Sequence, residues 1–323
     1  MSFNREFLQR INKAPDEKID SECIDMHIHY TDFLQQSDGM KSLINQMDQS
    51  NVKKCVIFGL PVKKKWDAIE PERPQTYLDD EAKCYYYSLA DELLAQQYLG
   101  LDEANKKRIA PTICSFNPTD CTAVDYIRFM LKKYDFWKGI GELLLRHDDL
   151  TNLTMEETAR VNHPALNEIF RLCEDENIPL NIHQNSTSVG HNDRFEYLHE
   201  LESVLQIYDA TFVWAHCGAS RRVTNKDYAA MVKGMLDRYD NLYVDISWVV
   251  YDDIVCKNLK PKDDWVKLIE NNSDRFMIGS DLCGHYEKLG KTLARYNGLI
   301  RKLSPEKRSD VLYRNAEQIW FKD

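Results

Sequence analysis

Short apolar runs alternate with amphipathic stretches along most of the chain. The runs are rich in β-branched residues, which is typical of strands buried on both faces of a sheet. In the stretches between them, apolar residues recur at helical spacing. Eight strands are predicted, at Cys23–His29, Lys54–Leu60, Ile109–Ser115, Trp137–Leu143, Ile178–His183, Thr211–His216, Leu242–Ile246 and Phe276–Ser280.

Helices are expected between and after these strands. The candidates are Met40–Asp48, Glu81–Gln97, Ala123–Lys133, Pro164–Glu176, Phe195–Tyr208, Tyr228–Arg238, Asp264–Glu270, Tyr286–Leu303 and Pro305–Phe321. Repeated βα units, with no change in composition and no Gly/Ser linker, predict an α/β fold, a single closed (β/α)8 TIM barrel. A doubly wound open sheet is the alternative, but no GxGxxG motif follows the first strand.

Length and composition agree with one barrel domain over residues 1–323. The chain is 43% hydrophobic and has only 12 Gly and 10 Pro, so it can build a large core. Residues 1–20 are expected to form an N-terminal arm. The connection over residues 61–80 is unusually long for a compact domain, and we expect it to lie over the mouth of the barrel.

Charge and cysteine usage narrow the range of partners. The formal net charge of −10 argues against general nucleic-acid binding, which needs a concentrated positive surface. No run of 18 apolar residues occurs and the polar start does not resemble a secretory signal, so no membrane association is expected. The nine cysteines include no CxxC pair, and we interpret them as reduced thiols of a cytoplasmic protein. The oligomeric state is left open, a homo-oligomer included.

Polar side chains stand at the carboxyl ends of the predicted strands. In the segment Asp25-Met26-His27-Ile28-His29, the two histidines project to the same face because side chains alternate along a strand. The remaining candidates end the fourth, fifth, sixth and eighth strands: Glu142, His183, His216 and Asp281. In a barrel these strand ends form the face on which active sites are built.

This mixture of imidazoles and carboxylates is typical of a divalent metal site. Such ligands hold Zn²⁺, Mn²⁺ or Fe²⁺ and leave a position open for water, whose pKa the ion lowers toward neutrality. A nearby carboxylate, here Asp281, can then carry the water's proton to a leaving group. The sequence therefore predicts one or two divalent ions, with zinc the leading candidate and manganese or iron as alternatives.

The order HxH, Glu, His, His and a final Gly279-Ser280-Asp281 resembles the amidohydrolase superfamily, and within it the amidohydrolase 2 branch of metal-dependent barrels. The resemblance spans most of the chain. It implies that His27, His29 and Asp281 bind a buried ion. His183 and His216 would bind a second ion or, in one-metal members, His183 would join the first ion and His216 would act on the substrate. Glu142 would replace the carboxylated lysine that bridges two ions in many relatives.

Further candidates lie on predicted loops. Arg221 and Arg222 are expected to bind a substrate carboxylate or phosphate, with one of the two pointing inward; a solvated or salt-bridged pair is the alternative. His147 and His191 are expected at the loop surface rather than against the substrate. His285 is a candidate to support the metal ligands. Trp66 and Trp248 are candidates to line the pocket.

The predicted function is metal-dependent hydrolysis of an amide, lactone or ester bond in a small polar or anionic molecule by metal-activated water. Asp281 and His216 are the expected catalytic residues. Two other reactions of such barrels remain open, non-oxidative decarboxylation and phosphoester hydrolysis. A barrel that binds a ligand without catalysis is the alternative of a different class.

Overall fold

The sheet at the centre of the molecule consists mainly of parallel strands. The computed structural model describes residues 16–64, 82–86 and 89–322. Within them, a nine-stranded sheet has the order β12-β9-β8-β7-β6-β5-β2-β1-β13, and all of its neighbouring strands run parallel. Its strands are β1 (Cys23–His29), β2 (Val52–Phe58), β5 (Ile109–Ile113), β6 (Gly139–Leu144), β7 (Leu180–His183), β8 (Phe212–Trp214), β9 (Leu242–Asp245), β12 (Phe276–Met277) and β13 (Leu282–Cys283).

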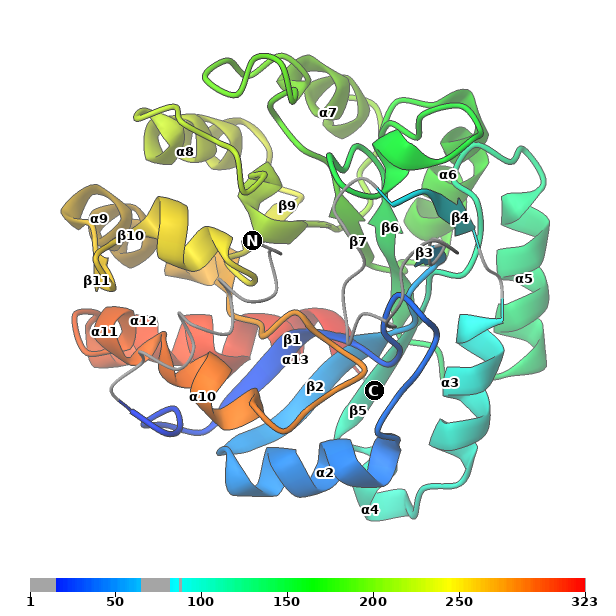
Figure 1. Ribbon diagram of the computed structural model, residues 1–323, viewed down its shortest axis with the longest axis horizontal. Coiled ribbons are helices and arrows are strands. Elements are labelled where there is room, and N and C mark those ends of the chain that lie inside the picture. The colour runs from blue at the N-terminus through cyan, green and yellow to red at the C-terminus, as the bar shows by residue number, and fades with distance from the viewer. Residues whose placement is uncertain (1–15, 65–81, 87–88, 323) are drawn as a thin grey trace, which may run out of the picture.

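Backbone hydrogen bonds bring the first and last strands of the barrel together. The Met26 amide donates to the Ile278 carbonyl oxygen at 3.1 Å, and the Asp281 amide donates to the His27 carbonyl oxygen at 2.8 Å. The segment that follows β12 therefore lies against β1. Figure 1 shows the helices arranged around these strands. The predicted TIM barrel is confirmed, and all eight predicted strands correspond to strands of this sheet.

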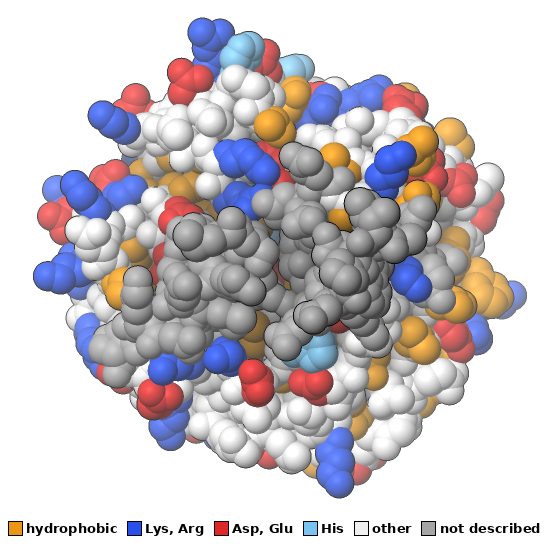
Figure 2. All heavy atoms as spheres, viewed as in Figure 1, with side chains coloured by type: hydrophobic (Ala, Val, Ile, Leu, Met, Phe, Trp, Pro, Cys, Tyr) orange, Lys and Arg blue, Asp and Glu red, His pale blue; other side chains and the backbone are white. Residues whose placement is uncertain are grey.

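Helices follow the strands in the expected order. They are α2 (Met40–Gln49), α3 (Ala90–Leu99), α4 (Glu103–Lys106), α5 (Ala123–Lys133), α6 (Asn167–Asp175), α7 (Leu198–Leu205), α8 (Tyr228–Arg238), α9 (Asp263–Asn271), α10 (Leu289–Ala294), α11 (Asn297–Ile300), α12 (Pro305–Ser309) and α13 (Asn315–Trp320). None of the helices in the described ranges is both long and apolar enough to cross a membrane. On the face seen in Figure 2, described basic and acidic side chains are interspersed and form no broad basic patch.

One predicted helix is wrong at its beginning. Within the range predicted as the helix Glu81–Gln97, β4 (Cys84–Tyr86) pairs antiparallel with β3 (Val62–Lys64), and α3 begins only at Ala90. Aromatic residues favour strands where a partner strand is available, and β3 supplies that partner. The rest of the expected mouth loop, 65–80, and residues 1–15 of the expected arm lie outside the described residues.

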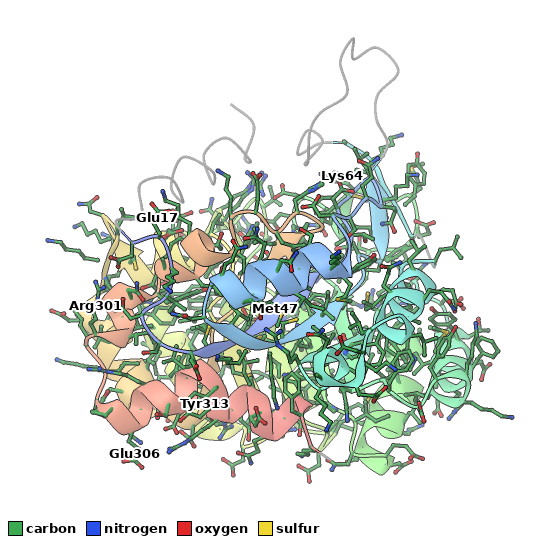
Figure 3. All side chains as sticks on the ribbon, turned by 90° about the horizontal axis from the view of Figure 1, so that it is seen from below. Glu17, Met47, Lys64, Arg301, Glu306 and Tyr313 are labelled. Carbon is green, nitrogen blue, oxygen red and sulfur yellow. The ribbon has the colours of Figure 1, made fainter. Side chains whose placement is uncertain are left out.

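The two ends of the barrel differ in character. Lys64 lies at one end and Tyr313 at the other, as Figure 3 shows. At the end near Tyr313, α13 brings the Trp320 ring, which is 1% exposed, into an apolar cluster that includes Ile24 and Ala316. A Cβ at Gly139 would lie 2.2 Å from that ring, so only glycine fits there. The polar side chains of the strand ends face the opposite end, where the chemistry is expected.

Candidate metal centre

Two strands of the sheet carry an extra residue at the site. β1 advances one residue more than β2 around His27, and β6 advances one residue more than β7 around Glu142. Such bulges bend a strand and re-aim its side chains. Gly141 makes the second one feasible, because it has φ of 116° and a Cβ there would lie 2.1 Å from the Asn181 carbonyl oxygen. The bulges bring His27 and Glu142 to face each other across the barrel.

The two histidines of β1 are held so that both Nε2 atoms face the site. The Nδ1 of His27 lies 3.1 Å from Oδ2 of Asp245, and the Nδ1 of His29 lies 3.0 Å from the Gly59 carbonyl oxygen. Both partners only accept hydrogen bonds, so each Nδ1 carries a proton and each Nε2 is the nitrogen directed into the site. The His27 Nε2 is buried and has no hydrogen-bond partner among the described residues. A buried ring nitrogen of this kind fits a metal ligand.

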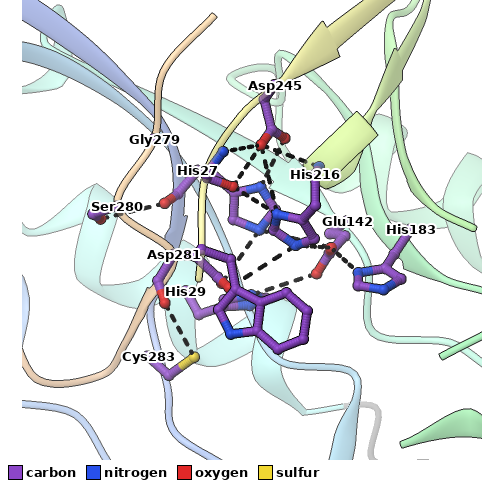
Figure 4. A network of polar contacts seen from close by, with 12 residues as sticks. His27, His29, Glu142, His183, His216, Asp245, Gly279, Ser280, Asp281 and Cys283 are labelled. Carbon is purple, nitrogen blue, oxygen red and sulfur yellow. Dashed lines mark hydrogen bonds and ion pairs between the residues drawn. The ribbon is translucent and has the colours of Figure 1, made fainter. Parts of the chain in front are cut away.

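Glu142 stands between the histidines of β1 and the two histidines of the later strands. Its Oε2 lies 3.4 Å from the His29 Nε2, and its Oε1 lies 2.9 Å from the His183 Nδ1. The same Oε1 is 3.7 Å from the Nε2 atoms of both His27 and His216. Figure 4 shows this carboxylate between the imidazoles. Glu142 therefore belongs to two groups of ligand atoms at once, as expected of a bridging residue.

Asp281 closes the site from the end of the last barrel strand. Its Oδ1 lies 3.2 Å from the His29 Nε2 and 3.4 Å from the His27 Nε2, and its Oδ2 is 3.9 Å from the His216 Nε2. A Cβ at Gly279 would lie 2.6 Å from that of His27, so glycine allows this segment to approach β1. The structure thus brings together all six predicted ligands, and Asp281, with an 11% exposed side chain, is the most open of them.

His216 lies just beyond β8, in the short helical segment η3 (Ala215–Gly218), with φ of 56°. Its Nδ1 lies 2.8 Å from the Ser247 Oγ. Burial lowers the pKa of His216 to about 4. The ring is therefore neutral near pH 7, and its Nε2 lone pair faces Glu142 and Asp281. These features fit a metal ligand better than an imidazolium that stabilises negative charge.

Asp245, at the end of β9, is a site residue that the sequence reasoning missed. One oxygen accepts from the His27 ring, and the other accepts from the Ser247 hydroxyl at 2.5 Å and from the His216 amide at 3.3 Å. Burial opposes its ionisation, but the neighbouring His27 lowers the pKa of Asp245 to about 2. The same criterion that found the other ligands, a polar residue at the end of a predicted strand, also applies to Asp245.

The electrostatics of the site favour a cation. Burial alone would lower the pKa of His27, but the carboxylates of Glu142, Asp245 and Asp281 outweigh it and raise that pKa well above its usual value. The side chains of this cluster thus stabilise positive charge at its centre. Ligand atoms of three residues lie within 4.8 Å of one another in several combinations, two of which share Glu142. These side chains fit one or two divalent ions.

Asp25 is a buried carboxyl group on β1 that bonds to the backbone rather than to a histidine ring. Its Oδ1 accepts hydrogen bonds from the amides of His27 and Ser280, whereas its Oδ2 has no hydrogen-bond partner among the described residues. Burial raises the pKa of Asp25 to about 7. Of two neighbouring acids on β1 and β9, only Asp245 is thus held firmly as a carboxylate.

Aromatic rings cover the histidines on the loop side. The Trp248 ring lies 5.2 Å from that of His216 and 6.4 Å from that of His183, centroid to centroid, so Trp248 lines the site. His147 is 6% exposed and stacks on His183 at 4.4 Å, so its expected position at the loop surface is wrong. The loop after β6 folds back on β7 instead. Trp66 lies outside the described residues.

Two other candidate histidines lie away from the ligands. His191 is exposed and its Nδ1 lies 2.9 Å from a carboxylate oxygen of Glu196, as expected for a surface loop. His285 contacts Asp38 at 2.9 Å and Asp32 at 3.4 Å. These contacts place His285 among loop carboxylates, and none of them reaches a predicted metal ligand.

Arg221 and Arg222 both contact one carboxylate. Arg221 Nε donates to Asp149 Oδ2 at 2.8 Å, and Arg222 Nη2 donates to Asp149 Oδ1 at 2.6 Å. Arg222 also lies 3.5 Å from Asp148, which accepts from Asn185 at 3.0 Å. The two guanidinium groups thus share a partner, as in the salt-bridged alternative. Substrate binding by either arginine stays a prediction.

Comparison of the sequence with known families agrees with this geometry. A family model described as amidohydrolase matches residues 24–322. The matched range includes all six predicted metal ligands. No curated protein matches the sequence.

Solved structures share the fold at low sequence identity. A Burkholderia multivorans amidohydrolase with bound zinc has 14% identity and a TM-score of 0.53, with 93% of this chain and 99% of that one covered. A probable 2-pyrone-4,6-dicarboxylic acid hydrolase from Acinetobacter baumannii, with citric acid bound, has 14% identity and a TM-score of 0.58 at the same coverage. Dihydroorotase from Campylobacter jejuni has 17% identity and a TM-score of 0.55, with 94% and 84% covered.

Proposed function

Because this chain belongs to the amidohydrolase family, we propose that it is a hydrolase with two divalent ions, which cleaves an amide, lactone or ester bond of a small polar or anionic molecule. Zinc is the ion we expect. One observation carries the proposal: Glu142 lies between the histidines of β1 and the pair formed by His183 and His216. A carboxylate with one oxygen toward each group is suited to bridge two ions.

The side chains divide into ligands and a proton carrier. His27 and His29, with Asp281, would hold one ion, while His183 and His216 would hold the other. Ions bound there would polarise the scissile carbonyl group and activate a water molecule at neutral pH. Asp281 has the most exposed carboxylate of the cluster, so it can take a proton from the attacking water and pass it to the leaving group.

Surrounding groups prepare these side chains for their roles. Asp245 and Ser247 keep the Nε2 lone pairs of His27 and His216 directed into the site. Trp248 excludes water from the side of His216 and His183 that it covers. Asp148, Asp149 and the two arginines lie on loops beside the site, where an anionic substrate could exchange with Asp149 as a partner of Arg222.

The proposal is tested by metal content and by turnover. Purified protein should contain two equivalents of a divalent metal by elemental analysis. It should hydrolyse at least one member of a panel of lactones, N-acyl amino acids and esters, each offered with and without a carboxylate. His27→Ala and Asp281→Asn should abolish turnover and leave the circular dichroism spectrum unchanged. Arg171→Ala, a change in an exposed ion pair, is the control.

Other outcomes point to other functions. One tightly held ion together with release of CO2 from a carboxylated substrate would favour decarboxylation over hydrolysis. Turnover of phosphoesters alone would favour a phosphoesterase. Full activity of both His27→Ala and Asp281→Asn would contradict the assignment. Oligomeric state and a cytoplasmic location stay predictions, to be checked by light scattering and by fractionation.

A further inference from the structure

A cysteine stands beside the proposed ligands, at a position fixed by strand pairing. In the parallel ladder between β1 and β13, Cys283 is the register partner of His29. Side chains of register partners on adjacent strands project to the same face of a sheet. Backbone hydrogen bonds tie this segment to β1, because the amides of Asp281 and Gly284 donate to the carbonyl oxygens of His27 and His29. The thiol is therefore directed to the same side as the His29 imidazole.

The sulfur lies among metal-ligating atoms. The Cys283 Sγ, a ring nitrogen of His29 and a carboxylate oxygen of Asp281 are all within 4.8 Å of one another. Ligands of one tetrahedral zinc ion lie about 3.3–3.8 Å apart, since zinc–ligand distances are about 2.0–2.3 Å. Figure 4 shows Cys283 next to Asp281 and His29.

Among the described residues the thiol has no strong competing partner. It donates a hydrogen bond to the Asp281 carbonyl oxygen at 3.8 Å, a long contact even for sulfur. On its other side it packs against an apolar cluster that includes Phe33, Leu60 and Leu144. The sulfur is thus held at the boundary between an apolar wall and the carboxylates of the site.

We propose that Cys283 is a sulfur ligand of the ion held by His29 and Asp281, and that this soft donor makes the site select zinc over manganese and magnesium. The inference rests on the proposed metal site and adds a ligand and a physical reason for its preference for zinc. When the sulfur binds, the thiol releases one proton to solvent and forms one S–metal bond. Thiolates favour zinc, whereas oxygen-rich shells favour manganese and magnesium.

Cobalt substitution tests the proposal directly. Apo protein loaded with Co²⁺ should show a near-ultraviolet thiolate-to-cobalt charge-transfer band, besides the visible bands of bound cobalt. Cys283→Ser should lose the charge-transfer band and keep the visible bands. Cys84→Ser, a change in the same apolar cluster, should keep both. In competition titrations, the preference of Cys283→Ser for zinc over manganese should fall on the order of tenfold to a hundredfold.

The outcomes separate this inference from the proposed function. Visible cobalt bands without a charge-transfer band in the unaltered protein would overturn the role of Cys283 while the metal site stands. That result does not depend on any variant folding. A charge-transfer band that survives in Cys283→Ser would likewise overturn it, because another thiol would then be the ligand. Absence of any cobalt binding would overturn both proposals.

Discussion

The strand-end half of the site and its loop half are held by different means. At the strand ends, the imidazoles of His27, His29 and His216 have their Nδ1 atoms fixed by Asp245, the Gly59 carbonyl and Ser247, all buried. On the loops, Arg221 and Arg222 are 15% and 30% exposed, and both depend on Asp149. The strand-end histidines are therefore held in place by the sheet, whereas the loop arginines are held by ion pairs.

This difference assigns different tasks to the two halves. Ligands for an ion must be in place before the ion arrives, and side chains supported by strands and by a further shell of hydrogen bonds meet that demand. Substrate recognition tolerates exchange of partners, which a partly exposed ion pair permits. We therefore expect changes at the strand ends to affect metal binding and turnover. Changes on the loops should affect KM and stability.

After the complete loss of turnover expected in His27→Ala and Asp281→Asn, the largest effect is expected from Glu142→Gln. The amide keeps the shape of the side chain but removes the charge that faces both groups of histidines. The protein should then retain one ion rather than two, and turnover should fall by about 10²–10³-fold, the scale of losing one electrostatic contact to the transition state. Elemental analysis and steady-state kinetics measure the two effects.

A control for this change lies in the loop half. Asp148→Asn also exchanges a buried carboxylate for an amide, but Asp148 contacts Arg222 and Asn185 and no predicted ligand. It should keep two ions. Two ions in Glu142→Gln as well would show that Glu142 is not a bridge.

Asp245→Asn should have the next largest effect. It leaves one oxygen to accept a hydrogen bond but removes the negative charge beside the His27 ring, so metal affinity should fall about 10–100-fold. Asp25→Asn is the matched control. Asp25 is equally buried, but it accepts from the backbone amides of His27 and Ser280 and has a pKa of about 7, so the change should alter metal affinity little. Equal losses in the two variants, measured by competition with a chelating dye, would contradict the assigned role of Asp245.

The strand-end half could be predicted from the sequence, for a physical reason. A polar residue that ends a buried apolar run must lie at the rim of the sheet, and parallel strands gather such residues at one edge. This reasoning identified His183 and Asp281 without any knowledge of contacts. It could not foresee the bulges at His27 and Glu142, because a bulge depends on the register with a neighbouring strand.

The loop half could not be predicted to the same extent. Whether His147 is exposed depends on how the loop after β6 folds against His183, which no local pattern determines. The strand β4 was assigned to a helix because its partner β3 is distant in sequence. The arginines were recognised as candidates, but their shared partner Asp149 is 72 and 73 residues away along the chain. The burial of His147, the pairing of β4 and the shared partner of the arginines all depend on contacts between residues far apart in the sequence.

The smallest effect is expected from Arg222→Ala, on stability. Burial opposes ionisation of Asp149, but hydrogen bonds from Arg222 and Arg221 and the charge interaction with His147 lower the pKa of Asp149 to about 2. A lowered pKa stabilises the folded protein above the unfolded value of about 3.9, and the contribution disappears as the pH falls toward 2. Loss of Arg222 should therefore lower the free energy of unfolding at pH 7 by about 1–2 kcal/mol. The difference from the unaltered protein should shrink between about pH 4 and pH 2.

Urea denaturation at pH 7 and pH 3 measures this difference. The surface pair between Arg171 and Glu168 serves as the comparison, because both side chains are more than half exposed and such pairs contribute about 0–1 kcal/mol. Arg171→Ala should therefore change stability less than Arg222→Ala at pH 7. If Arg222→Ala leaves stability unchanged but raises KM for carboxylated substrates, the guanidinium binds substrate and does not stabilise the fold. A variant that loses bound metal instead would break the division between the two halves, since the loop ion pairs would then be supporting the ligands.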